Sequence, residues 1–532
     1  TDDVTSSIVI TKEGSHVRNL NFEPTEAVGA IDNAILVDIQ DPCACETRGM
    51  LFENLQIPTC GANGNFNYGV RFTGVIENYG DRSTDYSDVQ FMDVRVDGVL
   101  KDGVNFADSV GDVSDLHFEK FYSGSCGSSC TGGYGLYFNN HGKVENITME
   151  NSDNLGAEQQ SRYGIEKSQD GIRVNGDSVT KVSGFRIEDF EIKNNCDNGI
   201  YLKGNWENDD EAITLVDLTV KDTEISENGD VLGDSEQEGL FDGGFGILIG
   251  DLVFGDGDYP EVTEIHYSPA KLDKITLDNV QVFNNASGGA GLFASKVAGP
   301  EDGVEVKDSR FNQEVTGNGE NEQGFGLVVA GYEGIDGLEI SNSEFHDHNG
   351  GLSGVELTGL PVQNLSDGIA LLAAYQDGAH DDVEDVLIRN TEANNNDTSN
   401  DNGNGLRVEG KTVDGIDITK VSKFNDNGKN GIKLFGEEGV NDVTIEDGDE
   451  DEVREITANG NGNIGLLVES DRGNITDLSV TDAEFGKEGH KNKDNGVKVV
   501  TNEEDGDIGS SNSDGAVSFN NIAASYNLEH GM

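Results

Sequence analysis

A four-residue phrase, glycine followed by an apolar, any and another apolar residue, recurs fourteen times between residues 69 and 499. Most intervals between successive phrases are 26 to 47 residues, which predicts a solenoid built by stacking similar coils. Gly354 and Gly368 are only 14 residues apart, so one of them is expected to lie on a different face. The phrases begin at Gly69, Gly103, Gly135, Gly171, Gly199, Gly246, Gly291, Gly326, Gly354, Gly368, Gly405, Gly431, Gly465 and Gly496.

A second strand-like run lies between successive phrases. Residues 185–192, 272–280 and 415–418 largely alternate apolar and polar side chains, which is the period of a strand with one buried face. No segment has a long helical period, so helices are expected to be minor. Asparagines precede many phrases, as in Asn194-Asn195, and stacked asparagines of this kind can form amide ladders.

The segments NNCDNGIYLKG and NDNGKNGIKLFG resemble the repeats of the pectate-lyase-like right-handed β-helix superfamily. The resemblance covers most of the chain and implies an all-β fold, a single-stranded right-handed parallel β-helix, or β-solenoid. We expect a Cys-rich N-terminal cap and first coil in residues 1–66, β-helix repeats in 67–500 and a C-terminal tail or cap in 501–532. The superfamily includes lyases, hydrolases, tailspikes and adhesins, so the resemblance does not assign a function.

The charge is extreme, with 101 acidic and 35 basic residues and a formal net charge of −66. Such a surface repels itself at low salt, and its composition resembles that of surface proteins of halophilic microbes. A calcium-binding surface is the alternative, because calcium prefers carboxylate oxygens. No cofactor is otherwise required. The sign of the field disfavours nucleic acid and anionic membranes as partners.

The six cysteines indicate an oxidising compartment, and therefore a secreted or cell-surface protein. An even count predicts disulfides, with 15 possible pairings that the sequence leaves open. A zinc site is the weaker alternative, because the cysteine spacings do not match ligand knuckles. The chain starts at Thr1 without a signal-like run, as expected of a processed product, and no run of 18 apolar residues could span a membrane. The cysteines are Cys43, Cys45, Cys60, Cys126, Cys130 and Cys196.

Catalytic candidates are few. Polygalacturonase-type members of the superfamily use aspartates on successive coils, and Asp170 and Asp197 are the nearest match here. The histidine of a Gly-His-Gly and the Arg-x-Lys of those enzymes have no counterpart, and an aspartate before a turn glycine is also a good turn residue. Arg173 and Lys203 are the corresponding candidates for the base of a lyase. These features favour a protein without catalysis.

Two histidine-containing segments are candidates for a metal site. His346-Asp347-His348 places two histidines on one strand face, and His380-Asp381-Asp382 follows farther along the chain. The competing interpretation is that both segments are solvated turns.

The third residue of each phrase is expected to point outward, because its two apolar neighbours face the core. Stacking would align these residues in one outward row, in which five of 14 are basic, whereas the chain average of 35 in 532 gives about one. Basic members can pair with carboxylates of the same chain, or they can form a contact surface. The members expected at an interface are Tyr201, Leu248, Phe293, Val328, Arg407 and Lys433.

Three functions remain open from the sequence. The first is an extracellular structural or adhesive β-solenoid that self-associates into a surface assembly or filament. The second is a polysaccharide lyase or glycoside hydrolase acting on uronic-acid polymers. The third is a glycan-binding, tailspike-like module. The expected partners are another copy of the chain and an anionic polysaccharide.

Overall fold

The computed structural model describes most of the chain and divides it into two compact units. The first unit comprises Thr1–Gln237 with Gly243–Ile249, and the second comprises Glu238–Asp242 with Gly250–Met532. The described residues are 6–22, 31–39, 47–57, 66–74, 84–125, 133–151, 163–176, 179–203, 214–229, 244–254, 262–266, 271–286, 288–297, 303–312, 324–348, 356–357, 360–361, 366–373, 381–396, 402–447, 455–502, 506–509, 516–524 and 527.

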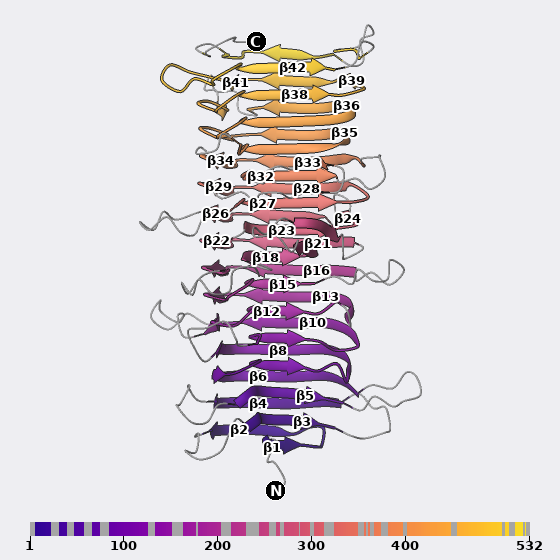
Figure 1. Cartoon of the computed structure of the whole chain (residues 1–532), viewed down its shortest axis with the longest axis vertical. Coiled ribbons are helices and arrows are strands. Elements are labelled where there is room, and N and C mark those ends of the chain that lie inside the picture. The colour runs from indigo at the N-terminus through magenta and orange to yellow at the C-terminus, as the bar shows by residue number, and fades with distance from the viewer. Residues whose placement is uncertain are drawn as a thin grey trace. The chain divides into compact units, whose positions relative to one another are not determined.

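The first unit is a stack of coils in which each strand pairs in parallel with its counterpart on the next coil (Figure 1). The strands that carry the glycine phrase, together with β1 and β3 in the same column, are called phrase strands. They form the column β1 (Ser6–Ile10), β3 (Ile31–Asp38), β5 (Phe66–Thr73), β7 (Val104–Phe106), β9 (Leu136–Phe138), β12 (Ile172–Val174), β15 (Ile200–Leu202) and β18 (Phe245–Ile249). The long strands form a second column, namely β2 (His16–Asn21), β4 (Thr47–Ile57), β6 (Thr84–Val99), β8 (Val110–Ser125), β10 (Gly142–Glu150), β13 (Val179–Glu188) and β16 (Thr214–Lys221). The third column contains the end of β8 followed by β11 (Gly164–Glu166), β14 (Glu191–Lys193) and β17 (Glu224–Ser226).

The second unit repeats the same three columns. Its phrase strands are β23 (Gly288–Ala294), β27 (Leu327–Gly331), β32 (Ile369–Ala373), the first halves of β35 (Leu406–Thr419) and β36 (Ile432–Glu446), β38 (Leu466–Ser470) and β42 (Val497–Thr501). Its long column consists of β21 (Lys271–Asp278), β24 (Lys296–Val297), β25 (Val304–Lys307), β28 (Ile335–Ser341), β33 (Val383–Arg389), the second halves of β35 and β36, β39 (Asn474–Ile475), β40 (Leu478–Thr481) and β43 (Ser518–Asn520). Its third column consists of β22 (Gln281–Phe283), β26 (Arg310–Asn312), β29 (Glu344–His346), β34 (Glu392–Asn394), β37 (Ile456–Thr457) and β41 (Ala483–Glu484). Two antiparallel pairs are separate from these columns, β19 (Asp251–Phe254) with β20 (Val262–His266) and β30 (Glu356–Leu357) with β31 (Leu360–Pro361).

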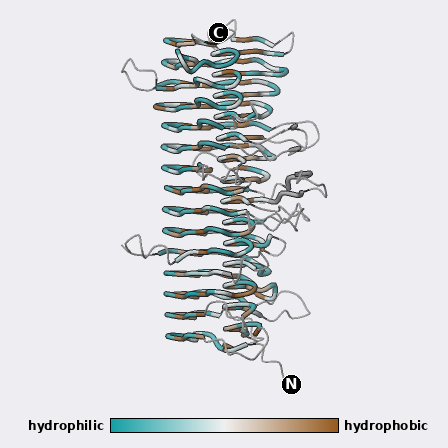
Figure 2. The backbone as a smooth tube through the Cα atoms, turned by 60° about the vertical axis from the view of Figure 1, so that its left-hand side comes forward, coloured by the Kyte–Doolittle hydropathy of each residue, from teal (hydrophilic) through white to brown (hydrophobic). Residues whose placement is uncertain are grey.

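Alternate side chains of the strands fill the interior of each unit, so apolar and polar segments follow one another along every coil (Figure 2). In the first unit, identical residues stack on consecutive coils. Phe72 stacks on Phe106 at 4.5 Å between ring centroids, and Phe106 stacks on Phe138 at 5.2 Å. Aromatic pairs of this geometry add to the stabilisation from burial alone.

The phrase glycines are required by close approach of the coils. A Cβ on Gly171 would lie 2.5 Å from the carbonyl oxygen of Gly199 on the next coil. A Cβ on Gly431 would lie 2.8 Å from the carbonyl oxygen of Gly465 and 2.8 Å from the amide nitrogen of Asn461. No side chain fits at these distances, which is the physical basis of the repeated glycine.

Asparagine and aspartate occupy the left-handed backbone positions. Among the described residues, 23 of the 28 non-glycine residues with positive φ are asparagine or aspartate. These two residues tolerate that conformation because their short polar side chains bond locally. The fold therefore accounts for part of the acidic composition, because aspartate suits its left-handed backbone positions.

The prediction of an all-β parallel solenoid is confirmed, and the described residues contain strands but no helix. Gly368 begins the true phrase of its pair, since Ile369 pairs with Leu327, whereas Glu356 after Gly354 lies in an antiparallel pair. Strand pairing is continuous across residue 66, the expected end of the N-terminal cap and first coil, because β3 pairs in parallel with β5. The described part of the chain includes no helix suited to crossing a membrane.

Candidate functional site

The outward row exists in the first unit. Register pairs Arg71 with Asn105, Asn105 with Tyr137, Tyr137 with Arg173 and Arg173 with Tyr201. Neighbouring strands are about 4.8 Å apart, so these side chains follow one another along one face.

Tyrosine rings hold the cations of this row. The Arg173 guanidinium lies 4.9 Å from the centroid of the Tyr134 ring and 5.0 Å from that of Tyr201. The Tyr68 ring lies 4.6 Å from the Arg71 guanidinium and 5.3 Å from the Lys101 ammonium. Such cation–π contacts fix the positions of the charges.

We call these residues the basic-aromatic shelf. Its members are Tyr68, Arg71, Lys101, Tyr134, Tyr137 and Arg173. All are half-buried except Lys101, which is exposed, so rings and charges are both accessible from outside. Among the described residues, no carboxylate forms an ion pair with Arg71 or Lys101, although both cations act electrostatically on the buried Asp102.

Asp170 lies beneath the shelf and is fully buried. Its carboxylate accepts hydrogen bonds from the backbone N–H of Asn198 at 2.9 Å and its side-chain amide at 3.0 Å, and from Arg173 at 3.0 Å. Burial raises the pKa of Asp170, and Arg173 opposes that shift. This geometry gives Asp170 a role in joining two coils.

Of the other catalytic candidates, Arg173 is the one bonded to the Asp170 carboxylate. In the register, Asp170 corresponds to Asn198 and not to Asp197, whose carboxylate accepts a hydrogen bond from Gln169 at 2.9 Å. Lys203 follows β15 and donates its backbone N–H to Val174.

Asp102 is a buried acid that the sequence analysis missed. It is 5% exposed, and its carboxylate accepts hydrogen bonds from the Tyr134 backbone N–H at 2.9 Å and the Asn105 amide at 2.5 Å. Burial raises the pKa of Asp102 to about 6, against the effects of these donors and of Lys101 and Arg71. The signal was its position directly before Gly103, the position that Asp170 takes before Gly171.

The second unit carries a row of its own. Register pairs Ala370 with Arg407, Arg407 with Lys433 and Lys433 with Leu467. Arg407 forms an ion pair with Glu409 at 2.7 Å, and Lys433 pairs with the same carboxylate. Burial alone would raise the pKa of Glu409, but the two cations outweigh it and lower that pKa.

The apolar members of the expected interface are covered. Tyr201, Leu248, Phe293 and Val328 are 7%, 1%, 1% and 0% exposed. Phe293 also lies outside the row, because Val328 pairs with Gly291 and Phe293 pairs with Ala330. These four side chains are therefore too buried to form a contact surface.

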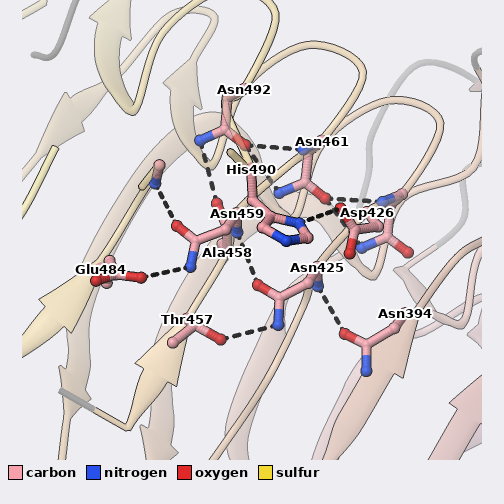
Figure 3. A network of polar contacts seen from close by, with 12 residues as sticks. Asn394, Asn425, Asp426, Thr457, Ala458, Asn459, Asn461, Glu484, His490 and Asn492 are labelled. Carbon is pink, nitrogen blue, oxygen red and sulfur yellow. Dashed lines mark hydrogen bonds and ion pairs between the residues drawn. The ribbon is translucent and has the colours of Figure 1, made fainter. Parts of the chain in front are cut away.

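Both histidines of the metal candidate in the second unit lie at asparagine positions of stacked ladders. His346 replaces an asparagine in the outer ladder, where its Nδ1 accepts the Asn394 backbone N–H at 3.3 Å. From Asn394 this ladder continues through Asn425 and Asn459 at 2.7 and 2.8 Å (Figure 3). His346 therefore acts as a hydrogen-bond acceptor of this ladder through Nδ1.

His348 lies in the inner, buried ladder. The ladder runs from Asn396 through Asn427 and Asn461 to Asn492, each asparagine donating both its backbone and side-chain N–H groups to the next side-chain oxygen. His348 takes the same place one coil before Asn396, but its two ring nitrogens and the Asn396 Oδ1 have no hydrogen-bond partner. Burial lowers the pKa of His348 to about 3.

No group of metal ligands occurs among the described residues. His380 lies outside them, and Asp382 accepts the Thr412 backbone N–H at 3.0 Å. Cys196 is disulfide-bonded, and the other five cysteines lie outside the described residues.

Comparisons of this chain with models of protein families, with curated proteins and with solved structures gave no match.

Proposed function

We propose that this protein is a non-catalytic, extracellular adhesive β-solenoid that binds an anionic polysaccharide along the basic-aromatic shelf of its first unit. The observation that carries the proposal is the pairing of cations and half-exposed rings on one outward face, with Arg71 and Lys101 over Tyr68. A pectate-lyase-like ancestry would be consistent with such a ligand.

The chemistry of the shelf fits uronate or sulfate sugars. Guanidinium groups bind planar carboxylates through paired donors, and tyrosine rings pack against the apolar faces of sugar rings. Asp102, the carboxyl group whose pKa both Arg71 and Lys101 lower, is buried, so the two cations can still bind an anionic ligand from outside.

The net charge of −66 makes this face selective. A polyanion is repelled by the rest of the surface at low salt, whereas at about 1 M salt the Debye length falls to about 3 Å and only direct contacts count. Binding in ion-rich water therefore depends on the shelf itself, which suits an adhesive protein of such an environment.

Calorimetric titration with polygalacturonate and with neutral dextran tests the proposal. We expect binding of the polyuronate only, and a loss of at least tenfold in affinity for the double variant Arg71→Gln, Lys101→Gln. The matched control is Lys143→Gln, an exposed lysine on the long strand β10 of the same unit. Equal binding of dextran, or an unchanged affinity of the double variant, contradicts the proposal.

One observation favours a second candidate, hydrolysis or elimination at the shelf. A carboxyl group held protonated near pH 6 is typical of a general acid, and Asp102 is such a group. Release of reducing or unsaturated sugar ends that is lost in Asp102→Asn would support this alternative. Self-association into filaments stays a prediction, which electron microscopy of the native protein tests.

A further inference from the structure

We infer that the second unit carries its own anion-binding site, formed by Arg407, Lys429 and Lys433 beside Phe435, and that one chain is therefore bivalent for an anionic polysaccharide. This inference rests on the proposed function, because it assigns the same ligand class to a second place.

The site repeats the composition of the shelf within the second unit. Arg407 and Lys433 are neighbours in the outward row of β35 and β36. Lys429 lies two residues before the phrase glycine Gly431, just as Lys101 lies two residues before Gly103. The Lys433 ammonium lies 5.4 Å from the centroid of the half-buried Phe435 ring, so a cation and a ring again share one surface.

The carboxylates beside these cations are already engaged. Asp367 accepts the backbone N–H of Asn404 at 2.8 Å and its amide at 2.7 Å, and its second oxygen lies 3.7 Å from Arg407. Glu409 pairs with both Arg407 and Lys433. Both carboxylates are buried, with exposures of 1% and 3%.

Lys429 is the third cation of this cluster, after Arg407 and Lys433. No carboxylate lies within ion-pair distance of it among the described residues, although its side chain is exposed. Three cations thus face two carboxylates, which leaves the cluster with one excess positive charge in a chain of net charge −66.

The surroundings make this excess charge unfavourable until an anion arrives. Partial loss of surrounding water lowers the pKa of Lys429, and Lys433 and Arg407 lower it further, against the opposing effects of Asp367 and Glu409. A bound carboxylate or sulfate would offset both effects, so ligand binding and protonation of Lys429 favour each other.

On the side of Arg407, the buried Glu409 pairs in register with Phe435. On the other side, Glu469 pairs in register with Phe435 and accepts the Asn502 amide at 2.9 Å. A polymer whose charged groups alternate with apolar sugar faces fits these surroundings, because one acidic group can lie at Lys429 while a sugar ring covers Phe435.

Two sites on one chain change what the protein can do. A long polyanion bound at one unit is held at high effective concentration near the other, and two different polymers can be joined through one chain. We therefore expect cross-linking of polysaccharide as well as binding.

Titration with an oligogalacturonate of about six sugars tests the inference, with the stoichiometry as the readout. We expect two oligomers per parent chain, one for Lys429→Gln, and one for the double variant Arg71→Gln, Lys101→Gln. Turbidity of mixtures with long polygalacturonate is expected to fall at least tenfold in either variant. Lys491→Gln, an exposed lysine of the same unit, serves as the control and should behave as the parent.

The outcomes separate the two proposals. A stoichiometry of one in the parent, or of two in Lys429→Gln, overturns the second site and leaves the first intact. Absence of oligomer binding by the parent chain overturns both. Because Lys429 has no ion-pair partner among the described residues, an unchanged melting temperature is expected for Lys429→Gln and would exclude misfolding as the cause.

Discussion

Asp170 accepts both the backbone and the side-chain N–H of Asn198, one coil farther along the chain, at 2.9 and 3.0 Å. Asp367 forms the same pair of bonds with Asn404 in the second unit. A carboxylate can only accept, so each aspartate begins a ladder in which the following asparagine both donates and accepts. Asp170, one of the two aspartates that most resemble a catalytic pattern in the sequence, is therefore a member of the backbone scaffold.

Replacing Gly431 by alanine is expected to destabilise the second unit severely. The added Cβ would lie 2.6 Å from the Ala458 Cβ and 2.8 Å from the Gly465 carbonyl oxygen, so the coils must separate. We expect a loss of at least about 3 kcal/mol in the free energy of unfolding, measured by denaturant titration.

Gly14→Ala is the control that distinguishes a steric clash between coils from backbone strain. Gly14 has a φ of +67° but nothing within 4 Å of its Cβ position. We expect a cost of only about 1 kcal/mol there. Equal losses at the two positions would contradict the explanation from coil spacing.

His348→Asn is expected to stabilise the second unit, most strongly in acid. An asparagine restores the missing donor to the buried Asn396 Oδ1, which is worth about 1–3 kcal/mol. The unfolded chain protonates His348 near pH 6.5 and the folded protein only near 3, so parent stability is lost as the pH falls through that window. The His348→Asn variant should lose less stability than the parent over the same pH range.

Melting temperatures at pH 4 and pH 8 measure this effect. The exposed His141→Asn is the control and should show no gain at either pH. A variant at position 348 with a lower melting temperature at both pH values would show that the ring is needed where it lies.

Asp102→Asn is expected to raise stability at neutral pH. The folded protein holds the Asp102 proton up to about pH 6, whereas the unfolded chain releases it near 3.8, so parent stability falls as the pH rises through this window. At about 1.4 kcal/mol per unit, the variant avoids a loss of up to about 3 kcal/mol. Denaturant titrations of the parent and the variant at pH 4 and pH 7 measure the difference. A free energy of unfolding that rises equally in both proteins between these pH values would contradict the prediction.

Thermal stability is expected to rise with ionic strength. Stacking brings like charges together at the corners of the coils. Burial and then Asp222 raise the pKa of Asp189, and burial and then Asp442 raise that of Asp414. Salt at about 1 M screens such pairs. Equal melting temperatures in about 0.05 M and 2 M NaCl would contradict this account, and a gain in calcium chloride alone would instead indicate discrete ion sites.

Much of the fold was predictable because its rules are local. The phrase and its spacing predicted stacked coils, and the asparagines before the phrases predicted the buried ladder that now includes Asn427 and Asn461. The row position of Phe293 was wrong by two residues, since Gly289 and Gly291 both fit the start of a phrase and only the pairing with β27 selects the first. A shift of one residue likewise separates Asp197 from its neighbour Asn198, the true counterpart of Asp170.

The sequence by itself determined which backbone conformations this chain adopts, through glycine where coils touch and asparagine or aspartate where the backbone turns left-handed. Only the tertiary structure decided which polar groups bond to one another within the protein and which remain available to a ligand. Partners in the ladders are 26 to 48 residues apart, so no local pattern shows that Asp367 bonds to Asn404. Nor does one show that Lys429 has no ion-pair partner among the described residues. That division follows from the stacking of coils, because hydrogen bonds and ion pairs act over a few ångströms of space and not along the chain.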